Sequence, residues 1–401
     1  MGEALGIKWV LNCNVNKEEK SNLDSLSEVK AREVSDYHKS FPMYRETPLI
    51  GLKNLAQKLN LNQIYVKDES KRFGLNAFKV LGGSYASAVY LASKLSLDKS
   101  EISFDLLKNE DLKKKAGDMV FVTATDGNHG RGIAWTAKQL GYKSVIFMPK
   151  GSSSHRVDNI RSEGAEVIVL NCNYDDAVRH AKQYAMDNNG VLMQDTALEG
   201  YEDIPLWVMQ GYITIAYEVV SQLNEIKDKP THIVLQAGVG SFAAAMLGFF
   251  VNKYGKDDLK IIIVEPENAD CIYKSAVIND GEPHIVEGSL ETIMAGLSCG
   301  EPNPIAWPIL RDYADCFASC PDSISANGMS ILANPVGDDE RIVSGESGAP
   351  GIGLISLLME KDELRELKES IQLDNNSRVL IISTEGDTDP DSYRRIIRGE
   401  V

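Results

Sequence analysis

The chain has 401 residues, of which 43% are hydrophobic and 25% are charged, a composition typical of a globular protein large enough for two domains. Its formal net charge of -16 argues against nucleic acid and anionic membranes as partners, because an acidic surface repels both polyanions. The opening residues lack the features of a secretory signal, and no apolar run reaches the roughly 20 residues of a membrane span, so we expect a cytoplasmic protein.

In chain order, the first fifty residues give little structural signal before Thr47-Pro48-Leu49. Residues 96–117 are charged and lysine-rich, and we expect a surface insertion with some helix there. From residue 118 onward, short β-rich runs alternate with helical patterns, which is typical of a parallel sheet covered by helices. The expected strands are 119–123, 144–148 and 166–170, and the expected helices are 128–140, one ending near 160, and 174–186.

A second α/β series follows the first. It consists of a helix at 210–223, a strand at 233–236, a helix from residue 241, and strands at 261–264 and 379–383. No repeat of fixed period and no flexible linker separates the two series, so the domains are expected to be interleaved. The six cysteines show no metal-ligand spacing, so we expect no metal, and a disulfide between any two of them stays open.

The segment 76–84, Asn-Ala-Phe-Lys-Val-Leu-Gly-Gly-Ser, places Lys79 between Phe78 and a patch of small residues at the start of a helical pattern. Glycines let a backbone approach a ligand closely, and amides at a helix start bind anions. Loss of solvation there would lower the pKa of Lys79, so that its neutral amine could attack an aldehyde. A solvated surface lysine is the alternative that this segment leaves open.

Two further turns follow predicted parallel strands, where ligands collect in open α/β sheets. In residues 123–130, Asp126 or Asn128 either contacts a ligand or caps the following helix. In residues 236–243, a Gly-x-Gly turn before a helix is typical of a phosphate site. A dinucleotide site is the alternative, although Ala243 stands where the third glycine of that fingerprint would be.

The predicted strand 379–383 ends in hydroxyl side chains, Ser383 and Thr384. A neutral hydroxyl there could form a hydrogen bond with a ring nitrogen without forcing that nitrogen to be protonated. A capped turn after the strand is the equal alternative.

These segments keep the order of a known family. Residues 76–83 resemble the Ser-Phe-Lys-x-Arg-Gly-Ala motif of the fold-type II enzymes that use pyridoxal 5′-phosphate (PLP), the tryptophan synthase β and threonine dehydratase group. Residues 126–130 resemble the Ser-x-Gly-Asn-His turn of that group, and Thr47-Pro48-Leu49 matches its entry motif. Within the group, the Asn-Ala-Phe-Lys form, Asp126 and the runs 194–201 and 383–389 are most similar to the diaminopropionate ammonia-lyases.

The resemblance implies an α/β fold with two open, twisted, mostly parallel sheets and flanking helices, and an active site in the cleft between two domains. Residues 1–90 and 200–401 would form the large PLP-binding domain, with residues 91–199 inserted as the small α/β domain. It also implies a homodimer. Lys79 would carry PLP as a Schiff base and Asn128 would contact its phenolic oxygen. The other expected cofactor-binding residues are Phe78, the phosphate turn Gly238, Val239, Gly240 and Ser241, and Thr384 or Ser383 at the pyridine nitrogen.

The implied reaction is α,β-elimination of 2,3-diaminopropionate, in both D and L forms, to pyruvate and two ammonia by way of aminoacrylate. Two configurations need a base on each face of the substrate, and Lys79 and Asp126 are expected to supply them. Asp195 and Thr125 are expected to bind the substrate, because a carboxylate holds a β-ammonium firmly in a dry cleft. For Asp195, a helix cap near Glu199 stays open, and His129 is expected to be structural.

Three rival functions are weighed against this one. A serine or threonine dehydratase of the same fold would release one ammonia from a β-hydroxy substrate. A non-catalytic relative would keep the fold without the cofactor, and a nucleotide-binding oxidoreductase is the third.

Overall fold

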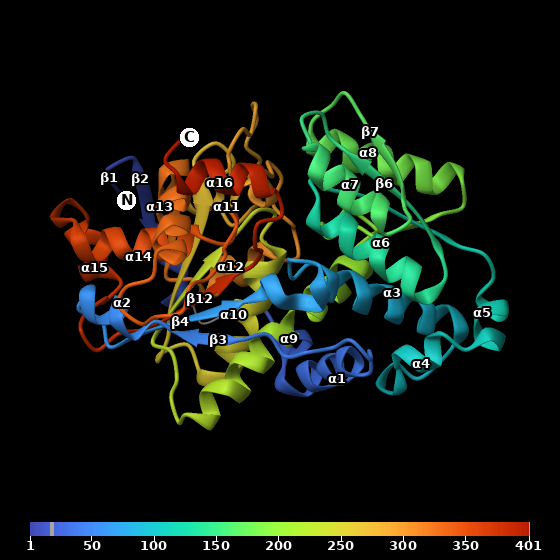
Figure 1. Ribbon diagram of the computed structural model, residues 1–401, viewed down its shortest axis with the longest axis horizontal. Helices are drawn as coiled ribbons and strands as arrows, with labels where there is room; N and C mark the ends of the chain where they lie inside the picture. The colour runs from blue at the N-terminus through green and yellow to red at the C-terminus, as the bar shows by residue number, and fades with distance from the viewer. Residues whose placement is uncertain (17–19, 401) are drawn as a thin grey trace. The chain divides into compact units, whose positions relative to one another are not determined.

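The computed structural model describes residues 1–16 and 20–400, and the chain forms two compact units (Figure 1). Unit 1 comprises Met1–Ser27, Thr47–Lys71 and Glu218–Val401, and unit 2 comprises Glu28–Glu46 and Arg72–Tyr217. The segments of the two units alternate along the sequence. Residues 28–46, 72–90 and 200–217 belong to unit 2 and contribute helices to it.

Unit 1 contains an eight-stranded sheet with the order β1-β2-β11-β10-β9-β12-β4-β3. The five strands from β11 to β4 pair in parallel, whereas β1, β2 and β3 run antiparallel to their neighbours. The three central parallel strands, β10, β9 and β12, are buried and rich in Ile, Val and Leu, as expected for strands covered on both faces. The strands are β1 (Gly2–Ala4), β2 (Ile7–Leu11), β3 (Leu49–Gly51), β4 (Gln63–Asp68), β9 (His232–Gln236), β10 (Lys260–Pro266), β11 (Cys316–Cys320) and β12 (Arg378–Ser383).

The helices of unit 1 include three, α12, α14 and α16, that begin with proline in the first turn, where the missing N–H costs no helical hydrogen bond. One side of the sheet buries an apolar cluster that includes Val234, Val264 and Ile381. The helices are α2 (Lys53–Lys58), α10 (Ser241–Tyr254), α11 (Cys271–Ile278), α12 (Trp307–Tyr313), α13 (Asp322–Ala333), α14 (Pro350–Glu360), α15 (Arg365–Ser370) and α16 (Pro390–Ile397).

Unit 2 contains a four-stranded parallel sheet with the order β7-β6-β5-β8. Figure 1 shows α6, α7 and α8 beside these strands, in green. Helix α8 places Ala177, Ala181 and Ala185 on one face at helical spacing, and these residues pack against β5 and β6. The strands are β5 (Val120–Ala124), β6 (Lys143–Met148), β7 (Glu166–Val169) and β8 (Val191–Leu192).

Some helices of unit 2, among them α7 and α8, begin at side-chain caps. Ser153 caps α7 and Asn173 caps α8 by accepting hydrogen bonds from amides of the first turn. The helices are α1 (Glu28–Lys39), α3 (Val80–Leu95), α4 (Phe104–Leu107), α5 (Glu110–Ala116), α6 (Asn128–Leu140), α7 (Ser154–Ser162) and α8 (Tyr174–Asp187). A long helix, α9 (Asp203–Glu225), continues from unit 2 into unit 1.

The fold confirms the prediction of two mostly parallel sheets with flanking helices. Each predicted strand and helix is present, and the insertion 96–117 contains α4 and α5. The elements of the first fifty residues, β1, β2 and α1, were not predicted. Over residues 1–16 and 20–400, no helix has both the length and the apolar character that crossing a membrane requires. All six cysteines are free thiols.

Candidate active site

Lys79 is the residue from which α3 starts, because it occupies the N-cap position of that helix. Its side chain is 18% exposed and forms an ion pair with Asp195, with 2.6 Å between Nζ and Oδ2. Asp195 is almost fully buried, at 3% exposure of its side chain. The structure therefore brings together two site residues that the sequence analysis proposed from separate motifs.

The ion pair sets the charge of both groups. Burial lowers the pKa of Lys79, but the Asp195 carboxylate raises it more, so that the pKa lies above its ordinary value of 10.5. Burial raises the pKa of Asp195, yet the Lys79 ammonium outweighs it and holds that pKa below the ordinary 3.8. The prediction that lost solvation lowers the pKa of Lys79 is thus wrong in its net direction, because the sequence could not show the carboxylate.

Asp195 follows β8, and the backbone leading to it is held on both sides. The Tyr201 hydroxyl donates to the carbonyl oxygen of Leu192 at 2.9 Å and accepts from the amide of Gln194 at 2.9 Å. His129 approaches the carbonyl oxygen of Met193 at 2.7 Å through Nε2. These hydrogen bonds therefore fix the backbone that leads to Asp195 and so position its carboxylate.

The side chain of Gln194 joins Asp195 to the neighbouring strand. Its carboxamide oxygen accepts from the Thr123 hydroxyl at 2.8 Å and from the amide of Ala124 at 3.1 Å, at the end of β5. Its Nε2 donates to the Tyr174 hydroxyl at 2.8 Å. The Tyr174 hydroxyl in turn lies 3.5 Å from Oδ1 of Asp195. Gln194 lies in the run 194–201 on which the family resemblance rests, whereas Tyr174 was not predicted because no motif marks it.

The turn between β5 and α6 carries Asp126 and Asn128. Thr125 shapes this turn, because its buried hydroxyl oxygen accepts from the amides of Gly127 at 2.9 Å and Gly130 at 3.0 Å. Asp126 acts electrostatically on Lys79 and raises the pKa of that amine. The turn thus brings a second carboxylate into the electrostatic environment of Lys79.

In unit 1, the Gly-x-Gly turn lies where β9 ends and α10 begins. Gly240 is the N-cap residue of α10 and has φ of 94°, a left-handed conformation that favours glycine. The amides of a first helical turn have no carbonyl partner in their own helix, and the positive end of the helix dipole favours an anion there. A Cβ at Gly238 would meet Sγ of Cys299 at 3.2 Å, so this turn is compact. The unpaired backbone amides and the glycines, which leave room because they have no side chain, fit a phosphate group.

The two hydroxyls at the end of β12 have different surroundings. Ser383 donates to the Ser344 hydroxyl at 2.8 Å. Thr384 accepts from Nε2 of Gln236 at 3.0 Å and donates to the carbonyl oxygen of Ser347 at 3.4 Å. Both side chains are buried, and Gln236 belongs to the strand that leads to the glycine turn.

The expected site residues fall into two sets, one in each unit. Unit 2 holds Phe78, Lys79, Thr125, Asp126, Asn128 and Asp195, and unit 1 holds Gly238, Val239, Gly240, Ser241, Ser383 and Thr384. Lys79 contacts Asp195 directly, and Asp126 acts on Lys79 electrostatically. Tyr212 of α9 also acts on Lys79, and the sequence analysis missed it because it lies within an ordinary helical pattern.

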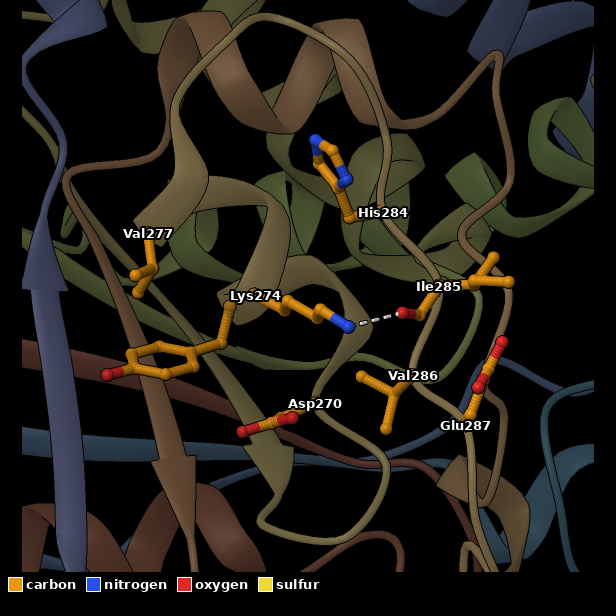
Figure 2. A pocket seen from close by; sticks show the side chains of 8 residues that line it. Asp270, Lys274, Val277, His284, Ile285, Val286 and Glu287 are labelled. Atoms are coloured by element: carbon orange, nitrogen blue, oxygen red, sulfur yellow. Dashed lines mark hydrogen bonds between the residues drawn. The ribbon is translucent and has the colours of Figure 1, made fainter.

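Unit 1 also contains a cavity of about 620 Å³ beside α11 (Figure 2). The Lys274 ammonium donates to the carbonyl oxygen of Ile285 at 2.8 Å and so joins α11 to the loop that follows it. No predicted site residue lines this cavity. Its lining residues are Asp270, Tyr273, Lys274, Val277, His284, Ile285, Val286 and Glu287.

Comparisons by sequence and by structure both relate the chain to the same family of enzymes. A family model described as pyridoxal-phosphate dependent enzyme matches residues 41–385. The diaminopropionate ammonia-lyase of Salmonella typhimurium is 54% identical over 367 residues, which cover 91% of this chain and 91% of that protein.

Two crystal structures of the Escherichia coli diaminopropionate ammonia-lyase superpose on the chain at 48% identity. The holo form has a TM-score of 0.92 and covers 98% of this chain and 97% of the other. The complex with an aminoacrylate-PLP azomethine reaction intermediate has a TM-score of 0.91 and covers 99% and 98%. With this likeness along nearly its whole length, the chain belongs to the pyridoxal-phosphate dependent enzymes, and among them to the diaminopropionate ammonia-lyase family.

Proposed function

We propose that the chain catalyses the α,β-elimination of 2,3-diaminopropionate, in both D and L forms, to pyruvate and two ammonia by way of aminoacrylate. The observation that carries this proposal is the buried ion pair of Lys79 and Asp195, with 2.6 Å between the charged atoms and a second carboxylate, Asp126, acting on the same amine. One amine between two carboxylates suits a substrate that itself brings two amino groups.

The residues of the chain fit PLP. When bound, PLP supplies an electron sink for the negative charge left at the α-carbon after proton removal. We assign Lys79, beside Phe78, to the aldehyde carbon of the cofactor and Asn128 to its phenolic oxygen. The phosphate is assigned to Gly238, Val239, Gly240 and Ser241, where the N-terminus of α10 offers amides.

Ser383 and Thr384 remain alternatives for the pyridine nitrogen, and the contacts favour Thr384. Ser383 is engaged with Ser344 at 2.8 Å, whereas the Thr384 hydroxyl donates only across 3.4 Å to Ser347. Such a long hydrogen bond is easily exchanged for a better one. Ser383→Ala and Thr384→Ala each remove one hydroxyl. The absorption spectrum of the PLP-loaded protein should change only in the variant that lost the partner of the pyridine nitrogen.

Lys79 and Asp126 are the proposed bases, one for each configuration of the substrate. A general base must be unprotonated at the moment it acts. Asp126 is a carboxylate, and Lys79 becomes a base once it gives its proton away. Thr125 holds the turn that carries Asp126, and we assign it to the substrate-binding residues through that turn.

Asp195 is the proposed partner of the β-ammonium of the substrate. A buried carboxylate that loses its cation is strongly destabilised, since little water reaches it. With Lys79 engaged in holding the cofactor, Asp195 would lack the ammonium that otherwise neutralises it. A substrate ammonium then restores the buried ion pair, which gives the carboxylate a preference for a diamino acid over a hydroxy acid.

The proposal is tested by assaying pyruvate from D- and L-2,3-diaminopropionate, D- and L-serine and L-threonine in parallel. We expect the diamino acids to react fastest, and equal or faster turnover of serine would favour the dehydratase alternative. Lys79→Ala should abolish the PLP that borohydride fixes to the wild-type chain. Retention of that covalent cofactor by the variant would refute the assignment of Lys79, and a wild-type chain that holds no PLP would indicate a non-catalytic relative.

We also propose a homodimer in the cytoplasm. The family resemblance supports the dimer, and six free thiols are typical of a reducing compartment. Light scattering coupled to size-exclusion chromatography tests the homodimer, and the expected mass is near twice the 44.1 kDa of the chain. Fractionation of the cells that produce the protein tests the cytoplasmic location.

A further inference from the structure

One asparagine, Asn303, holds both residues that flank Gly240 in the glycine turn of unit 1. Its backbone amide donates to the carbonyl oxygen of Val239 at 2.7 Å, and its side-chain Nδ2 donates to the hydroxyl oxygen of Ser241 at 2.7 Å. Both hydrogen bonds are short, and Asn303 and Ser241 are buried, at 0% and 2% exposure. Asn303 therefore fixes the turn on both sides of Gly240, although 62 residues separate it from Ser241.

Asn303 is itself held by the start of α12. Its carbonyl oxygen accepts from the amides of Ala306 and Trp307, each at 3.0 Å. Ala306 also packs against the glycine turn, because a Cβ at Gly240 would lie 3.6 Å from Cβ of Ala306. The position of Asn303 is therefore set by the helix that lies behind the turn.

The orientation of the Asn303 carboxamide follows from its neighbours. Its Oδ1 accepts from the backbone amide of Ile305 at 3.2 Å. A backbone N–H can only donate, so the carboxamide oxygen must face Ile305 and the carboxamide nitrogen must face Ser241. A carboxamide nitrogen also can only donate, so the Ser241 oxygen accepts from Asn303 and its single hydroxyl proton points elsewhere.

The direction of the Ser241 proton decides what the hydroxyl can bind. Ser241 is the first residue of α10, so its hydroxyl lies at the same helix end as the amides of the first turn. An ionised phosphate oxygen accepts hydrogen bonds, so a hydroxyl helps to bind phosphate only as a donor. The Asn303 carboxamide leaves Ser241 able to donate and brings no charge of its own, whereas a carboxylate at position 303 would take the proton and repel the anion.

We propose that Asn303 is a positioning residue for the phosphate of the cofactor, because it directs the Ser241 hydroxyl to donate to that anion. The same residue holds the turn in which Gly240 has φ of 94°. The inference deepens the proposed function, and it rests on that function only in assigning the phosphate of PLP to residues 238–241. Asn303 lies in the segment Glu-Pro-Asn-Pro, residues 301–304, which no motif marks.

The test compares Asn303→Asp with the matched control Asn252→Asp. Aspartate has the shape of asparagine, but its carboxylate accepts the proton of Ser241 and places a negative charge beside the turn. Asn252 lies near the other end of α10, and its Nδ2 donates to two backbone carbonyl oxygens at 2.8 Å and 3.2 Å. Each variant thus replaces an amide donor by a carboxylate beside the same helix, but only Asn303 contacts the glycine turn. Thermal unfolding shows whether each variant is folded.

The readout is the ratio of the dissociation constants for pyridoxal and for PLP, measured by absorbance at pH 8 on the full chain after removal of PLP with hydroxylamine. Pyridoxal has the ring and the aldehyde of PLP but no phosphate, so general damage to the site weakens both and leaves the ratio unchanged. Asn303→Asp should weaken PLP binding about 10- to 100-fold, because a hydrogen bond to a charged group is lost and a like charge is added. Its affinity for pyridoxal should stay near that of the wild type, and Asn252→Asp should keep the wild-type ratio.

A second variant, Asn303→Ser, keeps the test decisive if Asn303→Asp does not fold. A serine hydroxyl can still accept from the amide of Ile305, but it is too short to reach Ser241 and it adds no charge. The ratio should then fall about 3- to 10-fold, because one neutral hydrogen bond that orients the Ser241 hydroxyl is lost.

Two results would overturn the inference. The first is a wild-type ratio in a folded Asn303→Asp or Asn303→Ser chain, and the second is an equal loss of PLP and pyridoxal binding, which would mean a merely structural role. Failure of the proposed function looks different. A wild-type chain that binds PLP no more tightly than pyridoxal would refute the assignment of the phosphate to residues 238–241, and the inference would fall with it.

Discussion

His129 joins the start of α6 to the segment before Asp195, because its Nε2 lies 2.7 Å from the carbonyl oxygen of Met193. A carbonyl can only accept, so Nε2 carries the proton and the ring is the tautomer with an unprotonated Nδ1. Nδ1 is buried and has no hydrogen-bond partner among the described residues. In its neutral state, His129 thus holds the backbone that leads to Asp195.

The first prediction follows from that neutral ring. Burial lowers the pKa of His129, so below the unfolded value of about 6.5 the unfolded chain takes up a proton that the folded chain refuses. The free energy of unfolding should therefore be fully retained above pH 6.5 and fall as the pH drops below it, by up to about 1.4 kcal/mol per pH unit for this group. His129→Gln should reduce that slope in urea unfolding between pH 4.5 and pH 8.

The control for this variant is His232→Gln. His232 is also buried, its pKa is also lowered by burial, and its Nε2 lies 2.9 Å from the carbonyl oxygen of Ile371. Both variants should flatten the pH dependence, but only His129→Gln should lower kcat. An equal slope in wild type and His129→Gln would contradict the prediction.

A second prediction concerns the charge of Asp195. Asp195→Asn should lower kcat/KM for diaminopropionate about 100-fold, because it removes one member of a buried ion pair. Since Asp195 raises the pKa of Lys79, the variant should also lower that pKa. Acetic anhydride labels only neutral amines, so after removal of PLP the midpoint of Lys79 labelling against pH, followed by mass spectrometry, should move to lower pH. Asp176→Asn, an exposed aspartate on α8 paired with Arg179, should change neither quantity. A midpoint that rises in Asp195→Asn would refute the electrostatic argument.

A third prediction tests the glycine turn before α10. Gly240→Ala forces a Cβ onto a residue with φ of 94°, and that Cβ would meet the side chains of Leu310 at 3.1 Å and Ile272 at 3.2 Å. We expect a loss of about 1–2 kcal/mol in the free energy of unfolding and about tenfold weaker PLP binding, measured by absorbance. Gly255→Ala is the control, because Gly255 ends the same helix with φ of 80° and open space around its Cβ position. It should lose stability without losing PLP.

A fourth prediction concerns the buried ion pair of Lys67 and Glu218, which lie 2.7 Å apart at 0% and 2% exposure. Lys67→Met leaves the carboxylate buried without its cation and should cost about 3–5 kcal/mol in the free energy of unfolding. The control is Lys229→Met, which breaks an ion pair to Asp258 of the same 2.7 Å length at 48% and 60% exposure. That exposed pair should contribute less than about 1 kcal/mol. Similar losses in guanidinium unfolding would contradict the argument.

The fold was largely predictable where the chain alternates regularly between strands and helices. The series from β5 to α8 follows such a rhythm, and buried β-branched runs between caps leave little choice of structure. The first strands were missed because β1 has three residues and β2 pairs antiparallel with β11 from the far end of the chain. Their structure depends on a partner about 300 residues away and not on local pattern.

The site was predictable only in its separate parts. Lys79 and Asp195 each lie in a motif, but 116 residues separate them, and no local pattern states that they touch. The pKa of Lys79 was therefore expected in the wrong direction, since burial was foreseeable and the carboxylate was not. Tyr212 gave no signal at all, because its electrostatic effect on Lys79 depends on how α9 packs in unit 2 and not on local pattern.

The position of β12 in the sheet governs the order in which the chain can fold during synthesis. It lies between β9 and β4, with Ile381 opposite both Val234 and Val66. Both strands leave the ribosome before β12, and they cannot be joined until residue 383 has followed them. Unit 2 is complete at Tyr217, so its sheet can form while half of the protein is still being translated. A ribosome that stalls near the end would release a chain with a finished unit 2 and an open, aggregation-prone strand edge in unit 1.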